Sequence, residues 1–150
     1  MKISKNTMAI LKQAGWYEGR KIDVTETKLH CESMGYEVFP AVVKFLEEFG
    51  DLKIVIPKPN NLGEKEERHS TFTKRIIGNY FTHSGCIELE KYANEGLVVV
   101  GQACRENLLV YVSESGKVYC DTGWLGDTAI EAFESLISEK GFRSWSALGK

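Results

Sequence analysis

The stretch of residues 108–120 constrains the fold of this chain more than any other. Two predicted strands, residues 108–112 and 117–120, are separated only by Ser113-Glu114-Ser115-Gly116. So short a connection can join antiparallel strands as a hairpin, whereas parallel strands need a crossover of about a dozen residues or more. Gly116 suits the turn because glycine readily adopts positive φ angles. The sequence therefore predicts a β-hairpin within a mostly antiparallel sheet.

Further strands are predicted before this hairpin. Residues 97–100 form a continuous apolar run, and residues 52–56 show the alternation of a half-buried strand. Residues 71–77 are predicted as a short strand. By contrast, residues 57–70 contain prolines, asparagines and a dense run of mixed charge, which predicts a long exposed loop.

The clearest helix lies between Pro40 and Gly50. Proline is favoured in a first helical turn, and Gly50 is predicted to end the helix in a left-handed conformation. The side chains expected to face the core follow the i, i+3, i+4, i+7 spacing of a buried helical stripe. They are Val42, Phe45, Leu46 and Phe49.

Four more helices are predicted, at residues 4–14, 23–34, 86–93 and 128–140. Ser4 caps the first, and Asp23-x-x-Glu26 and Thr128-x-x-Glu131 resemble capping boxes. The spacing of Phe142, Trp145 and Leu148 predicts one more turn in the tail. The side chains expected to face the core are Met8, Leu11 and Ala14 in the first helix, Leu29 and Met34 in the second, and Ile130, Phe133, Leu136 and Ile137 in the last.

Helices, then strands, then a closing helix is the order of an α+β fold, with a mostly antiparallel sheet packed against several helices. A length of 150 residues predicts a single domain over residues 1–150. No apolar run approaches the roughly 18 residues of a membrane span, and residues 1–15 lack the apolar core of a secretory signal. We therefore expect a cytoplasmic protein with reduced, mostly buried cysteines, namely Cys31, Cys86, Cys104 and Cys120.

Acidic side chains are concentrated in the second half of the chain. The net charge is only −2, but seven acidic residues and a single basic one, Lys117, lie between Glu106 and Glu139. Such a segment repels phosphate backbones and attracts basic partners. We expect a protein partner and no nucleic acid.

The side chains predict no enzyme and no cofactor. None of the histidines (His30, His69 and His83) stands in a nucleophile elbow or a comparable device. His83 and Cys86 have the spacing of two zinc ligands, but a site needs at least three, and Cys104 or Cys120 would have to come from the sheet. The pattern favours a turn histidine beside a buried thiol, and we predict no metal site. An enzyme that uses His83 and Cys86 is the rival interpretation.

Four residues are predicted to bind a partner. Tyr119 and Trp124 flank Asp121 in the acidic segment, and Glu114 lies in the hairpin turn. Aromatic rings beside carboxylates are typical of protein interfaces, where rings anchor and charges steer. Packing in the core or at its rim is the alternative for the rings. The sequence also suggests that Asp121 and Glu114 can be changed to lysine without loss of the fold.

Several blocks of the chain match one family. They are Ala14-Gly15-Trp16-x-x-Gly19-Arg20, Ile22-Asp23, Met34-Gly35-Tyr36, the run from Pro40 to Leu52, Val100-Gly101, the hairpin from Glu114 to Tyr119, and the run from Leu125 to Ala132. Over residues 14–137 the chain resembles the SUKH superfamily, and most closely its third subgroup of bacterial immunity proteins. Gly50-Asp51-Leu52 stands where the family usually has Gly-Gly-Leu.

The resemblance implies a SUKH-like fold and a non-enzymatic immunity protein. Such a protein binds and neutralises a cognate toxin, often a nuclease, of a bacterial polymorphic or contact-dependent toxin system. The resemblance carries across no toxin-contacting residue, and Trp16 and Arg20 are expected to close the first corner against the sheet. The alternative is an intracellular scaffold or adaptor domain that is not linked to a toxin.

Overall fold

The described residues contain seven strands, which form one sheet in which each strand pairs antiparallel with its neighbour in sequence. The computed structural model describes residues 4–57, 66–71, 83–103, 108–121, 123–137 and 143–144. The strands are β1 (Lys53–Pro57), β2 (Glu66–Thr71), β3 (Leu97–Ala103), β4 (Leu108–Ser113), β5 (Val118–Cys120), β6 (Gly123–Gly126) and β7 (Arg143–Ser144). The helices are α1 (Lys5–Gln13), α2 (Thr25–Ser33), α3 (Pro40–Phe49), α4 (Ile87–Ala93) and α5 (Ala129–Ile137), with a 3₁₀ turn, η1 (His83–Gly85), before α4.

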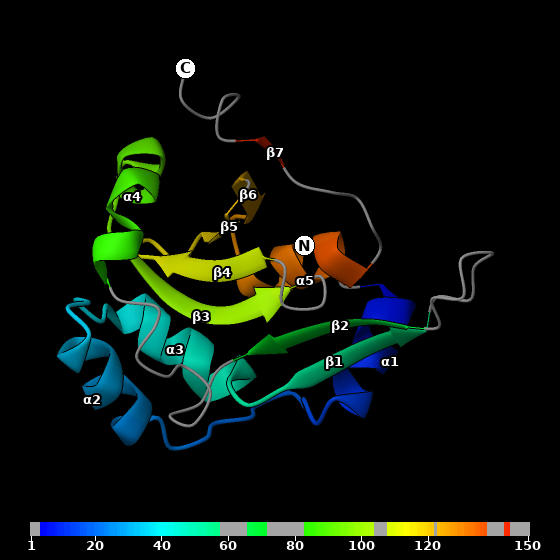
Figure 1. Ribbon diagram of the computed structural model, residues 1–150. Helices are drawn as coiled ribbons and strands as arrows, with labels where there is room; N and C mark the ends of the chain where they lie inside the picture. The colour runs from blue at the N-terminus through cyan, green and yellow to red at the C-terminus, as the bar shows by residue number, and fades with distance from the viewer. Residues whose placement is uncertain are drawn as a thin grey trace.

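This arrangement confirms the predicted α+β fold with an antiparallel sheet. Helices α1, α3 and α5 pack on β1, β4 and β6 respectively. Helix α2 lies outside α3, and α4 projects beyond the ends of β3 and β4 (Figure 1). Among the described residues, no helix combines the length and apolar character that crossing a membrane requires.

An aromatic cluster joins α3 to α5. Phe49 lies 4.9 Å from Phe133 between ring centroids, and Phe45 lies 6.1 Å from Phe133. Trp16 stacks on Phe49 with nearly parallel rings at 6.1 Å, and Arg20 donates a hydrogen bond to the Glu48 carbonyl at 3.0 Å. Trp16 and Arg20 are therefore structural, as predicted, although these contacts are with the end of α3 rather than with the sheet.

A buried carboxylate ties the first helix to the last. Glu134 of α5 is 4% exposed and accepts hydrogen bonds from the Ser4 backbone N–H and from the Ser4 and Thr7 hydroxyls. Ser4 caps α1 as predicted, because its hydroxyl oxygen also accepts from the Thr7 N–H at 3.2 Å. Buried carboxylates need such donors to offset their lost hydration.

Helix α2 differs from its prediction. Leu29 was expected to face the core but is 60% exposed, while Thr27 and Cys31 are buried instead. Asp23 accepts from the Thr25 N–H and hydroxyl, but Val24 occupies the N-cap position. A weakly amphipathic sequence leaves the helix rotation to its tertiary contacts.

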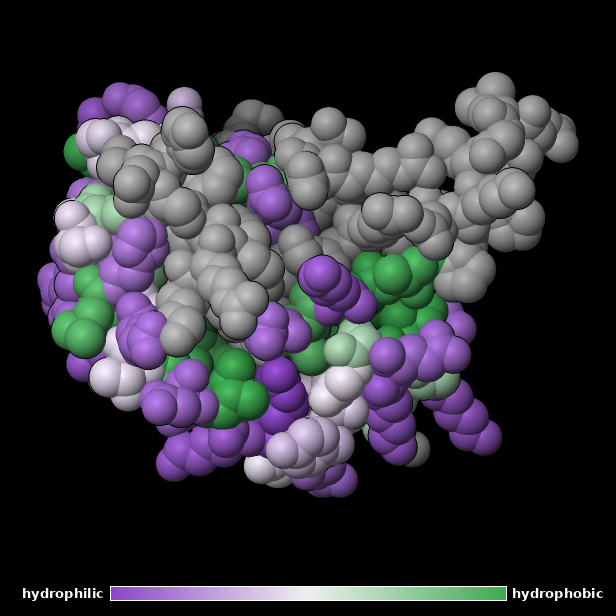
Figure 2. Space-filling model, turned by 60° about the horizontal axis from the view of Figure 1, so that its bottom comes forward, coloured by the Kyte–Doolittle hydropathy of each residue, from purple (hydrophilic) through white to green (hydrophobic). Residues whose placement is uncertain are grey.

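Figure 2 turns the underside of Figure 1 forward, and hydrophilic side chains dominate its coloured part.

The prediction of an exposed loop over residues 57–70 is wrong at both ends. Pro57 closes β1, and residues 66–71 form β2, which pairs with β1 from Lys53↔Ser70 to Pro57↔Glu66. Charged residues are poor strand formers by propensity, so the pairing with β1 overrides the local preference. Residues 58–65 lie outside the described part, as do residues 72–77 of the predicted short strand.

The predicted extra turn in the tail involves Phe142, Trp145 and Leu148, which lie outside the described residues. The described part of the tail, residues 143–144, forms β7 and pairs with Gly123 and Trp124 of β6. The structure confirms the predicted hairpin, helix α4 and the start of α5, where the Thr128 hydroxyl accepts from the Glu131 N–H.

The end of α3 corrects the role predicted for Gly50. Its φ is −66°, so it is not left-handed, whereas the next residue, Asp51, has φ +62°. A Cβ atom on residue 50 would lie 2.4 Å from the Leu46 carbonyl oxygen. Gly50 is thus required for close approach, and the left-handed position is the one at which the family usually has its second glycine.

Gly50→Ala should lower the free energy of unfolding by about 1–3 kcal/mol, because the added methyl overpacks against the backbone of α3. Asp51→Gly should change it by less than about 1 kcal/mol and in the stabilising direction, because glycine adopts positive φ without strain. Urea denaturation of both variants measures the difference. A larger loss for Asp51→Gly than for Gly50→Ala would contradict this assignment.

Candidate functional site

The β4–β5 hairpin positions Glu114 at the surface. The turn closes through hydrogen bonds from the Ser113 N–H to the Lys117 carbonyl and from the Gly116 N–H to the Ser113 carbonyl. Gly116 has φ +92°, as the turn predicts. The side chain of Glu114 is exposed, and the backbone N–H of Glu114 donates to the Gly96 carbonyl at 3.0 Å. This contact docks the hairpin turn against the connection that leads from α4 into β3.

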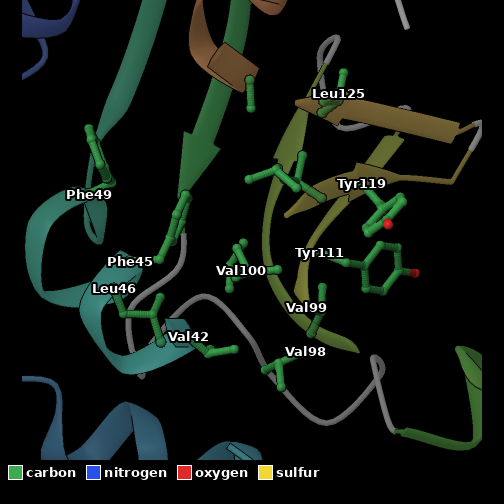
Figure 3. Close-up of a cluster of buried hydrophobic side chains, with 14 of the residues drawn as sticks. Val42, Phe45, Leu46, Phe49, Val98, Val99, Val100, Tyr111, Tyr119 and Leu125 are labelled. Atoms are coloured by element: carbon green, nitrogen blue, oxygen red, sulfur yellow. The ribbon is translucent and has the colours of Figure 1, made fainter. Parts of the chain in front are cut away.

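Tyr111, Tyr119 and Trp124 form a row across three strands. Tyr111 of β4 is paired with Tyr119 of β5, which is paired with Trp124 of β6. In Figure 3 the two tyrosine rings lie side by side and point away from Phe45 and Leu46 of α3. Tyr119 is only 4% exposed and Trp124 is partly exposed. The side of the sheet that faces α3 therefore carries apolar core residues, and the two tyrosines form a second, polar-tipped layer.

Carboxylates surround this row. Asp121 accepts from the Leu109 N–H at 2.8 Å and from the Tyr111 hydroxyl at 3.1 Å. The Trp124 indole N–H donates to Asp127 at 3.1 Å. Burial raises the pKa of Tyr111, and the nearby Asp121 carboxylate raises it further.

The carboxylate of Glu95 lies on the same side of the hairpin. It accepts from the Ser115 N–H and hydroxyl, both at 2.9 Å. Burial raises the pKa of Tyr119, and the Glu95 and Asp127 carboxylates raise it further. We call the set of Glu95, Glu114, Tyr119, Asp121, Trp124 and Asp127 the acidic edge.

The structure thus brings the four predicted residues onto one hairpin and its neighbouring strand. Tyr119 and Trp124 are adjacent, whereas Glu114 and Asp121 lie beyond opposite ends of β5. Glu95 was missed because it comes from the connection after α4, and no local pattern links it to the hairpin. Their role in binding a partner stays a prediction.

The described thiols differ from an activated nucleophile. A reactive cysteine needs a lowered pKa, but burial, followed by Glu90, raises the pKa of Cys86 to about 12. Burial, followed by Glu32, raises that of Cys31 to about 11. Cys31, Cys86 and Cys120 are free and buried, as predicted, while Cys104 lies outside the described residues.

The carboxylates of the acidic edge can present negative charge around an indole ring.

The fold and this edge define a small α+β protein whose antiparallel sheet carries exposed carboxylates beside a partly exposed tryptophan. The chain belongs to the SUKH-3 immunity protein family, whose family model matches residues 3–139. This match confirms the resemblance to the third subgroup of the SUKH superfamily. The comparison with curated proteins found no match, and neither did the comparison with solved structures.

Asp121 is a poor position for charge reversal, because its carboxylate holds two donors of β4. Asp121→Ala should lower the free energy of unfolding by about 1–3 kcal/mol, since the Leu109 N–H and the Tyr111 hydroxyl lose their acceptor. Asp121→Asn should cost less, because an amide oxygen still accepts. The matched control, Asp127→Ala, removes an exposed carboxylate and should stay within about 0.5 kcal/mol of the parent. Equal losses in denaturation at positions 121 and 127 would contradict the structural role of Asp121.

Proposed function

We propose that this protein is an immunity protein that binds a cognate toxin protein and neutralises it without covalent chemistry. The observation that supports this most directly is membership of the SUKH-3 immunity protein family over residues 3–139. The raised pKa values of the described thiols Cys31 and Cys86 favour a binding role over nucleophilic catalysis. The proposed setting is the cytoplasm of a bacterium with a polymorphic or contact-dependent toxin system.

The acidic edge is the proposed toxin-binding surface. Glu114 and Asp127 are exposed and can meet a partner directly, while Trp124 is partly exposed and donates its indole N–H to Asp127. Tyr119 is 4% exposed, so its proposed part is to support Trp124 from the neighbouring strand. Carboxylates that steer and an aromatic ring that anchors are the features of a protein-binding hot spot.

Because the acidic edge is negatively charged, we propose that its partner is basic. A nuclease toxin needs a basic cleft to hold phosphate groups, and an acidic surface is complementary to such a cleft. Electrostatic steering raises association rates by about 10–1000-fold at low ionic strength. Fast capture would protect a cell against a toxin that acts catalytically, so we propose a nuclease as the toxin.

Co-expression with the toxin encoded beside this gene tests the function. We expect the toxin alone to arrest growth, and we expect this protein to restore growth and to co-purify with the toxin in a stoichiometric complex. Nucleic-acid degradation by the purified toxin, and its loss in the complex, would support the nuclease assignment. Growth arrest that persists, with no complex, would refute the immunity function and favour the scaffold alternative.

The double variant Glu114→Lys/Asp127→Lys tests the acidic edge. We expect the association rate constant with the toxin to fall roughly tenfold or more at low ionic strength, because the steering charge is reversed. The control Glu18→Lys/Glu32→Lys changes the net charge equally at two exposed positions of the N-terminal half. Stopped-flow or surface-binding kinetics measure both, and melting temperatures verify folding. Equal slowing in the two double variants would remove the acidic edge as the binding surface.

A further inference from the structure

Three side chains of different donor type converge where η1 meets α4. The ring nitrogen of His83, the sulfur of Cys86 and a carboxylate oxygen of Glu90 all lie within 4.8 Å of one another. His83 Nε2 and Glu90 Oε1 are 2.7 Å apart. We propose that His83, Cys86 and Glu90 form a binding site for a divalent transition-metal ion, with zinc as the best fit.

The local backbone explains why these residues meet. The Cys86 N–H donates to the His83 carbonyl at 2.9 Å, and the Glu90 N–H donates to the Cys86 carbonyl at 3.0 Å. Cys86 and Glu90 are therefore one helical turn apart and share a face. The His83 N–H donates to the Met34 carbonyl at 3.1 Å, which anchors η1 on the end of α2. The motif is His-x-x-Cys-x-x-x-Glu.

The donor set matches the chemistry of zinc. Imidazole nitrogen, thiolate sulfur and carboxylate oxygen are its three usual protein ligands, at about 2.0–2.3 Å. Tetrahedral bonds of that length hold ligand atoms roughly 3.3–3.8 Å apart. The atoms of this cluster lie within 4.8 Å of one another, which is close to that spacing. Three protein ligands leave a fourth position for water or a partner's side chain.

Neighbouring groups already orient the three ligands. The second carboxylate oxygen of Glu90 accepts from the Leu97 N–H at 2.8 Å, which fixes its plane. Burial and Glu90 raise the pKa of Cys86, and the Tyr36 hydroxyl, which donates to the Cys86 sulfur, offsets part of that rise. Tyr36 also packs edge-on against the His83 ring at 5.5 Å. Outer contacts of this kind are typical of protein metal sites.

The site combines burial with access. Cys86 is 1% exposed, whereas the side chain of His83 is 32% exposed, so an ion can enter past the imidazole. A bound cation favours the thiolate over the thiol, so binding would release a proton from Cys86. The third ligand, Glu90, was not predicted from the sequence. The sequence predicted no metal site, and Cys104 or Cys120 was the third ligand that such a site would have needed. Cys120 is not among the three clustered residues, and Cys104 is outside the described part.

The test titrates the reduced, chelator-treated full-length protein with Zn²⁺ and, as a coloured substitute, with Co²⁺. We expect one equivalent of zinc to bind, the melting temperature to rise, and cobalt to produce a thiolate-to-metal charge-transfer band. Cys86→Ala and Glu90→Gln should each weaken zinc binding by at least about 100-fold, because loss of even an outer-shell partner costs about 10–100-fold. Glu90→Gln keeps an oxygen for the Leu97 N–H, so it tests the ligand role even if Cys86→Ala fails to fold.

Matched controls are Cys120→Ala and His30→Ala, which remove a buried thiol and an imidazole outside the cluster. Both should bind zinc like the parent. Absence of saturable one-to-one binding would overturn the proposal, as would binding unchanged by both Cys86→Ala and Glu90→Gln. Because zinc binding is measured on the isolated protein, its failure would leave the immunity function standing, and failure of toxin neutralisation would leave the metal site standing.

Discussion

The contact between Phe49 and Phe133 is the interaction on which most of this structure depends. Phe49 ends α3 and Phe133 lies in α5, and their ring centroids are 4.9 Å apart. Trp16 also stacks on Phe49, so residues far apart in sequence meet on one ring. Large buried rings contribute much of the hydrophobic free energy of a core and prefer defined geometries. The cluster therefore sets how α3 and α5 pack together beside the sheet.

The polar contacts around this core distribute the carboxylates between two tasks. Glu134, Asp121 and Glu95 accept backbone and hydroxyl hydrogen bonds that join separate elements. Glu114 and Asp127 stay exposed on the acidic edge. Structural carboxylates are costly to remove because their donors lose an acceptor. A surface that serves a partner can therefore vary at its exposed positions while the supporting ones hold the hairpin in place.

Patterns of short range were sufficient for much of the fold. The strongly amphipathic stripe of α3, the four-residue hairpin turn and the caps of α1 and α5 were each predicted and are present. Two of the misses, β2 and the rotation of α2, have a common cause. β2 is a charged segment that becomes a strand only beside β1, and Leu29 is exposed because the thin apolar stripe of α2 does not determine its rotation. Local propensity loses to tertiary contact wherever the local signal is weak.

The sequence by itself determined the α+β class, the antiparallel hairpin, the acidic bias near Tyr119 and Trp124, and the family to which the chain belongs. Those properties lie in neighbouring residues, where spacing and composition are sufficient. Only the tertiary structure decided that Glu95 joins the hairpin turn, that Asp121 supports Tyr111, and that Glu90 completes a triad with His83 and Cys86. Each of these depends on side chains brought within a few ångströms by packing and by hydrogen bonds, which a linear pattern does not encode.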